Sequence, residues 1–211
     1  MRKASKRFIT LVVVVMLLFS ISVTAYASEI QPRIDFVATM KVVSFTGGGV
    51  ASSFGYNGHS FLIFTNTWTS PITVGHFPVA PGESITIGTF GNRANHVGIW
   101  YNIEGCLGTS TTTYALVTAL TVAELQQVNQ TINSNDSWSA LSNNCSAFAV
   151  KVWNSVSSVD ISGWNPADVV SSIRSQDYYV TNVAIPSKTS SNIARHTSTS
   201  YEMDPTGYYS S

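Results

Sequence analysis

The order of the secondary-structure signals along the chain constrains its fold more than any other feature. Residues 34–102 contain short apolar runs, rich in β-branched and aromatic residues and separated by Gly, Pro, Asn and Ser. Runs of this length and composition favour β-strands over helices. They occupy residues 41–45, 60–64, 70–74, 84–87 and 96–101. Because the helix signals come after these strands, the sequence predicts a fold of the α+β class.

Three helices are predicted downstream of the strands. A capping-box pattern at Thr121 and Glu124 precedes apolar residues at helical spacing, which predicts a helix over about residues 122–133. An apolar stripe after Cys145 predicts a second helix that begins there. Asn165 is an N-cap residue followed by proline, which predicts the start of a third helix.

The first residues have the pattern typical of a secretory signal peptide. A basic segment, residues 1–7, precedes an apolar run of about a dozen residues, and Ala25 and Ala27 form an Ala-x-Ala cleavage site. A single membrane anchor is the alternative, but the uninterrupted run is shorter than the roughly 20 residues that span a bilayer. We expect residues 1–27 to be removed and the mature protein to be secreted, either extracellular or in a bacterial cell envelope.

The remaining residues are predicted to form one domain, residues 28–186, followed by a polar segment, residues 187–211. That segment contains mostly Ser, Thr and Tyr with few aliphatic residues. It is predicted to be either a disordered tail or a loose strand on the surface.

Composition excludes several classes of protein. The chain carries 11 basic and 11 acidic residues, and only 10% of its residues are charged. Residues 1–27 hold four of the basic residues and none of the acidic ones, so the mature chain has a net charge of −4. So few cations cannot neutralise many phosphates, which excludes a general nucleic-acid binder. Two cysteines are too few for a disulfide-built miniprotein or a zinc site made of thiolates.

Cys145 is the first candidate for chemistry because it follows Asn143 and Asn144 at the predicted start of an amphipathic helix. Unpaired backbone N–H groups and the positive end of the helix dipole favour a thiolate there, and the same groups could hold an oxyanion. Two other interpretations stay open. Cys145 is a small buried hydrophobic residue, or it forms a disulfide with Cys106, since export permits oxidation.

A thiol nucleophile needs a base, and the base needs a group that orients it. His59 opens one predicted strand and His76 ends the next strand-like run. If the two runs form a hairpin, the two imidazoles lie side by side, which suits a base and its orienting group. His96 is a rival base without an obvious polar partner, and His196 is predicted to be solvated in the polar tail.

A His at the head of a strand, a polar residue on the next strand and a Cys at the start of a later helix resemble the papain-like superfamily. Because the His precedes the Cys, the order is reversed from papain and resembles the circularly permuted NlpC/P60-type branch. The segments that carry the resemblance are residues 58–64, 72–77 and 143–153. The similar region covers about residues 35–175.

The resemblance implies an antiparallel β-sheet packed against the Cys-bearing helix. It implies Cys145 as nucleophile, His59 as base and His76 as the third, orienting residue. The reactions of this superfamily are cleavage of amide bonds, often in cell-wall peptides, with thioester or lipid acyl chemistry in some permuted members.

We therefore expect a secreted thiol hydrolase that cleaves an amide bond of a cell-wall or other peptide, or an ester bond. Its partner is a peptide, peptidoglycan or acyl substrate, and membrane contact is expected only through an uncleaved signal segment. No metal or cofactor is expected, because the His residues and carboxylates are dispersed. By position alone, Tyr56, Asn57 and Asn144 are candidates for a second oxyanion donor.

The alternative is a secreted binding or surface protein on the same scaffold without catalysis. Its tryptophans would then line a groove for a glycan or a peptide. The oligomeric state stays open.

Overall fold

The structure of this protein is a computed structural model that describes residues 35–47, 58–91 and 97–204. The predicted signal peptide, residues 1–27, lies outside these ranges. None of the described helices is long and apolar enough to span a membrane.

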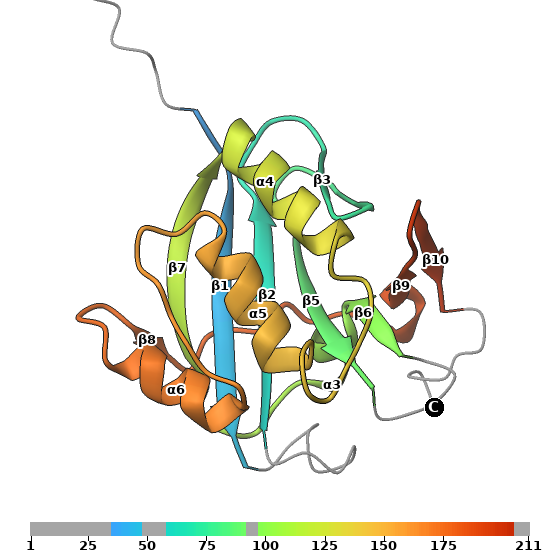
Figure 1. Cartoon of the computed structure of the whole chain (residues 1–211). Helices are drawn as coiled ribbons and strands as arrows, with labels where there is room; N and C mark the ends of the chain where they lie inside the picture. The colour runs from blue at the N-terminus through green and yellow to red at the C-terminus, as the bar shows by residue number, and fades with distance from the viewer. Residues whose placement is uncertain (1–34, 48–57, 92–96, 205–211) are drawn as a thin grey trace, which may run out of the picture. The chain divides into compact units, whose positions relative to one another are not determined.

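A large antiparallel β-sheet forms the centre of the described chain (Figure 1). Within the described residues it has eight strands, in the order β10-β9-β6-β5-β2-β1-β7-β8. The strands are β1 (Phe36–Thr46), β2 (Gly58–Asn66), β5 (Ser84–Phe90), β6 (Gly98–Tyr101), β7 (Tyr114–Thr121), β8 (Val180–Thr181), β9 (Ala194–His196) and β10 (Tyr201–Met203). A separate two-stranded ribbon consists of β3 (Ile72–Val74) and β4 (Phe77–Val79).

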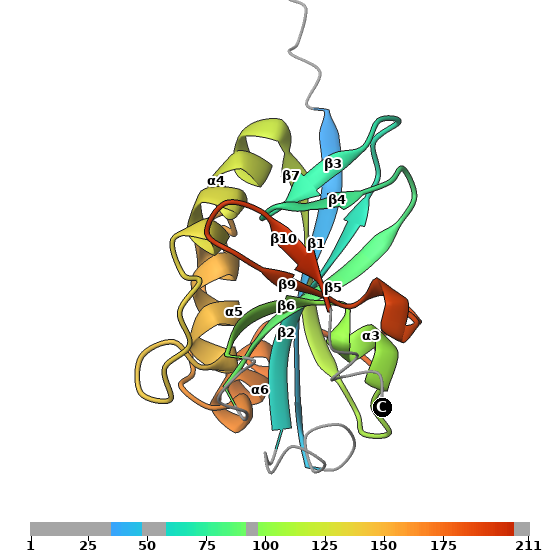
Figure 2. The ribbon, with the colours of Figure 1, turned by 90° about the vertical axis from the view of Figure 1, so that its right-hand side faces the viewer.

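Helices cover both faces of the sheet. The helices α4 (Val122–Asn133), α5 (Cys145–Asn154) and α6 (Pro166–Arg174) lie on one face, and the short helix α3 (Ile103–Leu107) and the 3₁₀ turn η1 (Ser190–Asn192) lie on the other (Figure 2). Thr121 and Asn165 cap α4 and α6 as predicted, and Asn144 caps α5; the side chain of each accepts a backbone N–H of the first turn. The predicted α+β class with an antiparallel sheet is confirmed.

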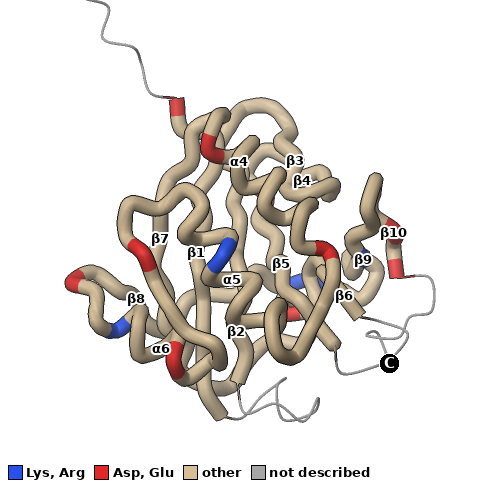
Figure 3. The backbone as a smooth tube through the Cα atoms, in the orientation of Figure 1, with Lys and Arg blue, Asp and Glu red and all other residues tan. Residues whose placement is uncertain are grey.

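The central strands are buried on both faces, and their side chains alternate between two parts of the core. Leu62 and Phe64 of β2 pack toward α5, whereas Phe61 and Ile63 pack on the opposite side with Val43. Charged residues are few and scattered over the described elements (Figure 3). Burial of apolar side chains, rather than ion pairing, therefore holds the sheet and helices together.

The predicted hairpin that joins His59 to His76 is wrong. Strand β2 pairs with β1 along one edge and with β5 along the other, so neither edge is free for the run that contains β3. Strand β3 pairs instead with β4. The Asn66 side chain stabilises the turn by which the chain leaves the large sheet after β2. Its Nδ2 donates to the carbonyls of Ser70 (3.0 Å) and Val79 (2.9 Å).

Part of the polar C-terminal segment belongs to the sheet. Strand β9 pairs with the edge of β6, and Ile193 is fully buried against Trp100 and Ile103. His196, predicted to be solvated, is only 2% exposed. That prediction is wrong because β9, which contains His196, pairs with the edge of β6, and the adjacent Ile193 is buried in the core.

Replacing Ile193 tests this docking. Ile193→Ala leaves a cavity in the cluster around Trp100, so we expect a loss of about 2–5 kcal/mol in the free energy of unfolding. Urea denaturation measures it. The exposed Ser198→Ala is the control and should stay within about 0.5 kcal/mol of wild type. Equal midpoints for both variants would contradict the observed packing of this segment.

Candidate active site

Cys145 is the first residue of α5, and this helix packs over β2 and β5. Asn144 caps the helix by accepting the Ala147 N–H at 3.0 Å. The first backbone N–H groups of a helix have no carbonyl partner within it, and together they carry a partial positive charge. The fold thus puts the thiol where a sulfur anion is favoured.

His59 lies near the start of β2 and is only 6% exposed. Its ring is stacked on Phe61, with centroids 5.8 Å apart, and lies 4.8 Å from the ring of Phe90. Gly58 precedes it with φ of 140°, and a side chain there would collide with the Phe45 carbonyl. The imidazole therefore packs between aromatic rings, and its nitrogen atoms are largely shielded from solvent.

Cys145 and His59 meet across a hydrogen bond between their side chains. Burial raises the pKa of Cys145, but the His59 charge, its hydrogen bond and the Ser60 backbone N–H outweigh burial and lower that pKa below 9. Burial likewise lowers the pKa of His59, but the Cys145 thiolate and the Glu104 carboxylate raise it from 6.5 to about 10. Both shifts favour the charged form of the pair, a thiolate beside an imidazolium, over the neutral thiol and imidazole.

Glu104, not His76, orients the imidazole. The Nε2 of His59 donates to Glu104 Oε1 at 2.9 Å, and the second carboxylate oxygen, Oε2, accepts from Thr86 Oγ1 at 2.7 Å. Glu104 is only 3% exposed. With both oxygens engaged, its carboxylate fixes the ring so that Nδ1 is the nitrogen left for the sulfur.

Two backbone features bring Glu104 to the imidazole. Asn102 turns the chain from β6 into α3 with φ of 68°, a left-handed conformation that asparagine tolerates. Its side chain fixes the turn by accepting the Thr86 N–H and donating to the Asn192 carbonyl. Gly88 of β5 leaves the space, since a Cβ there would collide with Glu104 Oε1 and lie 3.1 Å from His59 Nε2.

A row of three buried serines ties the cysteine helix to the sheet. The hydroxyl oxygens of Ser44 and Ser60 lie 2.9 Å apart, and those of Ser60 and Ser146 lie 3.0 Å apart. Ser44 also donates to the Pro166 carbonyl at 3.0 Å, which joins α6 to the row. Because Ser60 and Ser146 directly follow His59 and Cys145, this network sets the distance between base and nucleophile.

His76 lies in a different cluster. Its ring is stacked on His196, with centroids 4.8 Å apart, and its backbone N–H donates to the Tyr101 hydroxyl at 3.1 Å. Burial lowers the pKa of His196, which bonds Asn133 at 3.0 Å. The prediction that His76 orients His59 is therefore wrong, because β3 leaves the sheet before it can run beside β2.

Glu104 could not be predicted from a helix pattern, because α3 has only five residues and no side-chain cap. One signal could have found it: Glu104 is the only carboxylate between Glu83 and Glu124, and it follows an apolar strand. A lone acid at such a position is costly to bury without a partner.

The other candidates have separate outcomes. Cys106 and Cys145 are both free thiols, and Cys106 packs near Ile103. The Asn144 amide is already bonded to the Trp164 and Ala140 carbonyls, so it does not serve as a free oxyanion donor. Tyr56, Asn57 and His96 lie outside the described residues.

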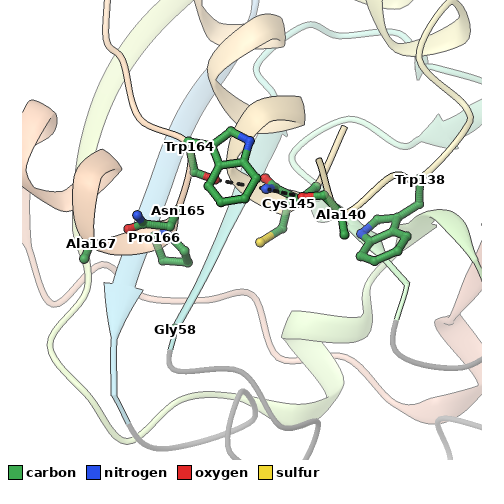
Figure 4. Close-up of a pocket in the computed structure, with 9 residues that line it drawn as sticks. Gly58, Trp138, Ala140, Cys145, Trp164, Asn165, Pro166 and Ala167 are labelled. Carbon is green, nitrogen blue, oxygen red and sulfur yellow. Dashed lines mark hydrogen bonds between the residues drawn. The ribbon is translucent and has the colours of Figure 1, made fainter. Parts of the chain in front are cut away.

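An apolar pocket of about 380 Å³ opens at the nucleophile. Trp138 and Trp164 lie on either side of Cys145 (Figure 4). The remaining lining residues are Gly58, Ala140, Asn144, Asn165, Pro166 and Ala167. The Cys145 side chain therefore lines an apolar pocket between two tryptophans.

No family model, curated protein or solved structure matches this chain. Within the described residues, no group of three or more His, Cys, Asp or Glu side chains is arranged to hold a metal ion.

The pH profile of thiol alkylation tests the ion pair. His59→Ala removes the imidazolium while Cys145 stays buried, so the pKa of Cys145 should rise. Because the thiolate is the reactive form, each unit of increase lowers the rate of iodoacetamide labelling at neutral pH about tenfold. Mass spectrometry of the Cys145 peptide excludes the Cys106 signal. His76→Ala is the matched control and should leave the profile unchanged; an equal shift in both variants would contradict the pairing.

Glu104→Gln tests the orienting carboxylate. Loss of its charge should lower the pKa of His59 from about 10. The imidazolium, present below that pKa, would then be lost at a lower pH. An NMR titration of the His59 ring protons follows this shift. The exposed Glu202→Gln provides the control and should titrate like wild type; an unshifted His59 in Glu104→Gln would rule out the pairing.

Proposed function

We propose that this chain is a thiol hydrolase of amide or ester bonds in which Cys145 is the nucleophile, His59 the acid and base, and Glu104 the orienting residue. The observation that carries the proposal is the arrangement of Cys145, which lines the pocket, with the buried His59 beside it and Glu104 bonded to His59 at 2.9 Å. Strongly shifted pKa values of a paired Cys and His in a pocket are the mark of an activated nucleophile.

Acylation follows from this arrangement. The Cys145 thiolate attacks the substrate carbonyl carbon and forms a C–S bond. As the tetrahedral intermediate collapses, the C–N or C–O bond breaks and the His59 imidazolium gives its proton to the leaving amine or alcohol. The acyl group remains on the sulfur as a thioester, and His59 is left neutral.

Deacylation reverses the roles. Neutral His59 takes a proton from water, and the hydroxide attacks the thioester carbonyl. The C–S bond then breaks, which releases a carboxylic acid and restores the thiolate–imidazolium pair. In both steps the Cys145 backbone N–H, in the first turn of α5, is the donor best placed for the oxyanion.

The architecture supports the resemblance to the circularly permuted NlpC/P60-type branch. An antiparallel sheet carries the His, a helix packed on it begins with the Cys, and the chain order is His, Glu, Cys. The signal-peptide pattern of residues 1–27 supports action outside the cytoplasm, in the cell envelope or beyond it.

Single-residue variants test the catalytic proposal. We expect Cys145→Ala to lose hydrolysis of p-nitrophenyl acetate, and His59→Ala to lower kcat by about 10²–10⁴-fold. Wild type treated with the ester should gain the mass of one acetyl group on Cys145, seen by rapid acid quench. His76→Ala should retain wild-type activity, because His76 lies outside the triad.

The competing function, a binding protein without catalysis, predicts a different result. Cys145 would then gain no acetyl group, and the variants of Cys145 and His76 would behave alike. Purified peptidoglycan fragments and lipid esters, each assayed with wild type beside Cys145→Ala, identify the natural class of substrate.

A further inference from the structure

The pocket beside Cys145 has walls that carry no charged side chain, as far as the described residues form them. None of the nine described residues that line it is Lys, Arg, Asp, Glu or His. Its lining includes the two tryptophans and the apolar residues Pro166, Ala140 and Ala167. At about 380 Å³ it has the size of a small-molecule site, in the lower part of the usual range of roughly 300–1,000 Å³.

The two polar side chains of this lining are already used by the protein. Asn144 accepts the Ala147 N–H and donates to the Trp164 carbonyl at 2.9 Å. Asn165 accepts the Asp168 N–H at 3.0 Å and donates to the Asp168 carboxylate at 2.8 Å. A ligand therefore meets apolar surface and the nucleophile, with few free polar groups to bond.

Both tryptophans are held in place although one of them is exposed. Trp164 is 52% exposed, yet its Nε1–H donates to the Leu141 carbonyl at 3.1 Å and its carbonyl accepts from the helix cap Asn144. Trp138 packs against Gly91, where a Cβ would collide with the indole. Exposing a large aromatic ring to water is unfavourable, so a ligand that covers the ring is favoured. Because the ring is already fixed, it loses little conformational entropy when the ligand binds.

We propose that Trp138 and Trp164 form an aromatic clamp that selects substrates with an uncharged, apolar acyl group next to the scissile bond. This inference rests on the thiol-hydrolase function proposed above and adds its substrate class. A charged group in this position would lose its hydration without gaining a partner, which disfavours it. The apolar acyl group is either the aliphatic chain of an acyl ester or the hydrophobic residue of a peptide.

A series of p-nitrophenyl esters measures the selection. From acetyl through butyryl and hexanoyl to octanoyl, kcat/KM should rise about fourfold for each methylene that the pocket buries. In the succinyl ester a carboxylate replaces the terminal methyl group of the butyryl chain, so its kcat/KM should lie well below that of the butyryl ester. An N-acetyl-leucyl ester supplies the peptide arm, so the ratio of leucyl to octanoyl rates tells which source the pocket prefers.

Variants of the clamp assign the selection to the indoles. Trp164→Ala and Trp138→Ala should each lower kcat/KM for the octanoyl ester about 30-fold and lower kcat/KM for the acetyl ester by a much smaller factor. Gly91→Ala, which displaces the Trp138 ring, should act like Trp138→Ala, and Trp164→Phe should recover part of the loss. Trp68→Ala, which removes a tryptophan outside the pocket, is the matched control and should change neither rate.

The outcomes separate this inference from the proposed function. A flat chain-length series, or an equal loss for acetyl and octanoyl esters in Trp164→Ala, would overturn the clamp while Cys145 acylation stands. Failure of every ester to acylate Cys145 in wild type would instead overturn the hydrolase itself.

Discussion

The buried contact between His59 and Glu104 is the constraint on which the site depends. Glu104 belongs to a helix on one face of the sheet, whereas Cys145 begins a helix that packs on the other. His59, at the start of the central strand β2, is the residue that connects them. The contact needs Gly88, because any side chain there would occupy the position of the carboxylate. The Glu104 carboxylate bonds both Thr86 and His59, and it raises the pKa of the imidazole.

Two further sets of hydrogen bonds hold Cys145 close to His59 and Glu104. The row of Ser44, Ser60 and Ser146 links two strands to the start of α5 through buried hydroxyl groups. Asn144 adds a second link, since it caps the same helix and fixes the Trp164 backbone beside the pocket. The proposed nucleophile and the Trp164 backbone are therefore both anchored at the start of the same helix.

Local signals predicted much of the fold and two of the three residues of the candidate site. The caps Thr121, Asn144 and Asn165 act on backbone groups within one turn, so their helices could be predicted from a few neighbouring residues. Cys145 and His59 could be found because each lies at the start of a regular element. The role given to His76 was wrong, since it required a strand pairing, and pairing depends on which distant strands compete for the edges of β2. The burial of His196 escaped prediction for the same reason.

By itself, the sequence determined the α+β class, the helix starts and the candidates for nucleophile and base, because propensity, capping and apolar periodicity are properties of neighbouring residues. Only the tertiary structure decided the third member of the site and the walls of the pocket. Glu104 and His59 are separated by 45 positions in the chain, and Trp138 and Trp164 come from loops on either side of α5. Contacts between residues so far apart in the chain depend on the order of the strands and on close packing, which no short stretch of sequence encodes.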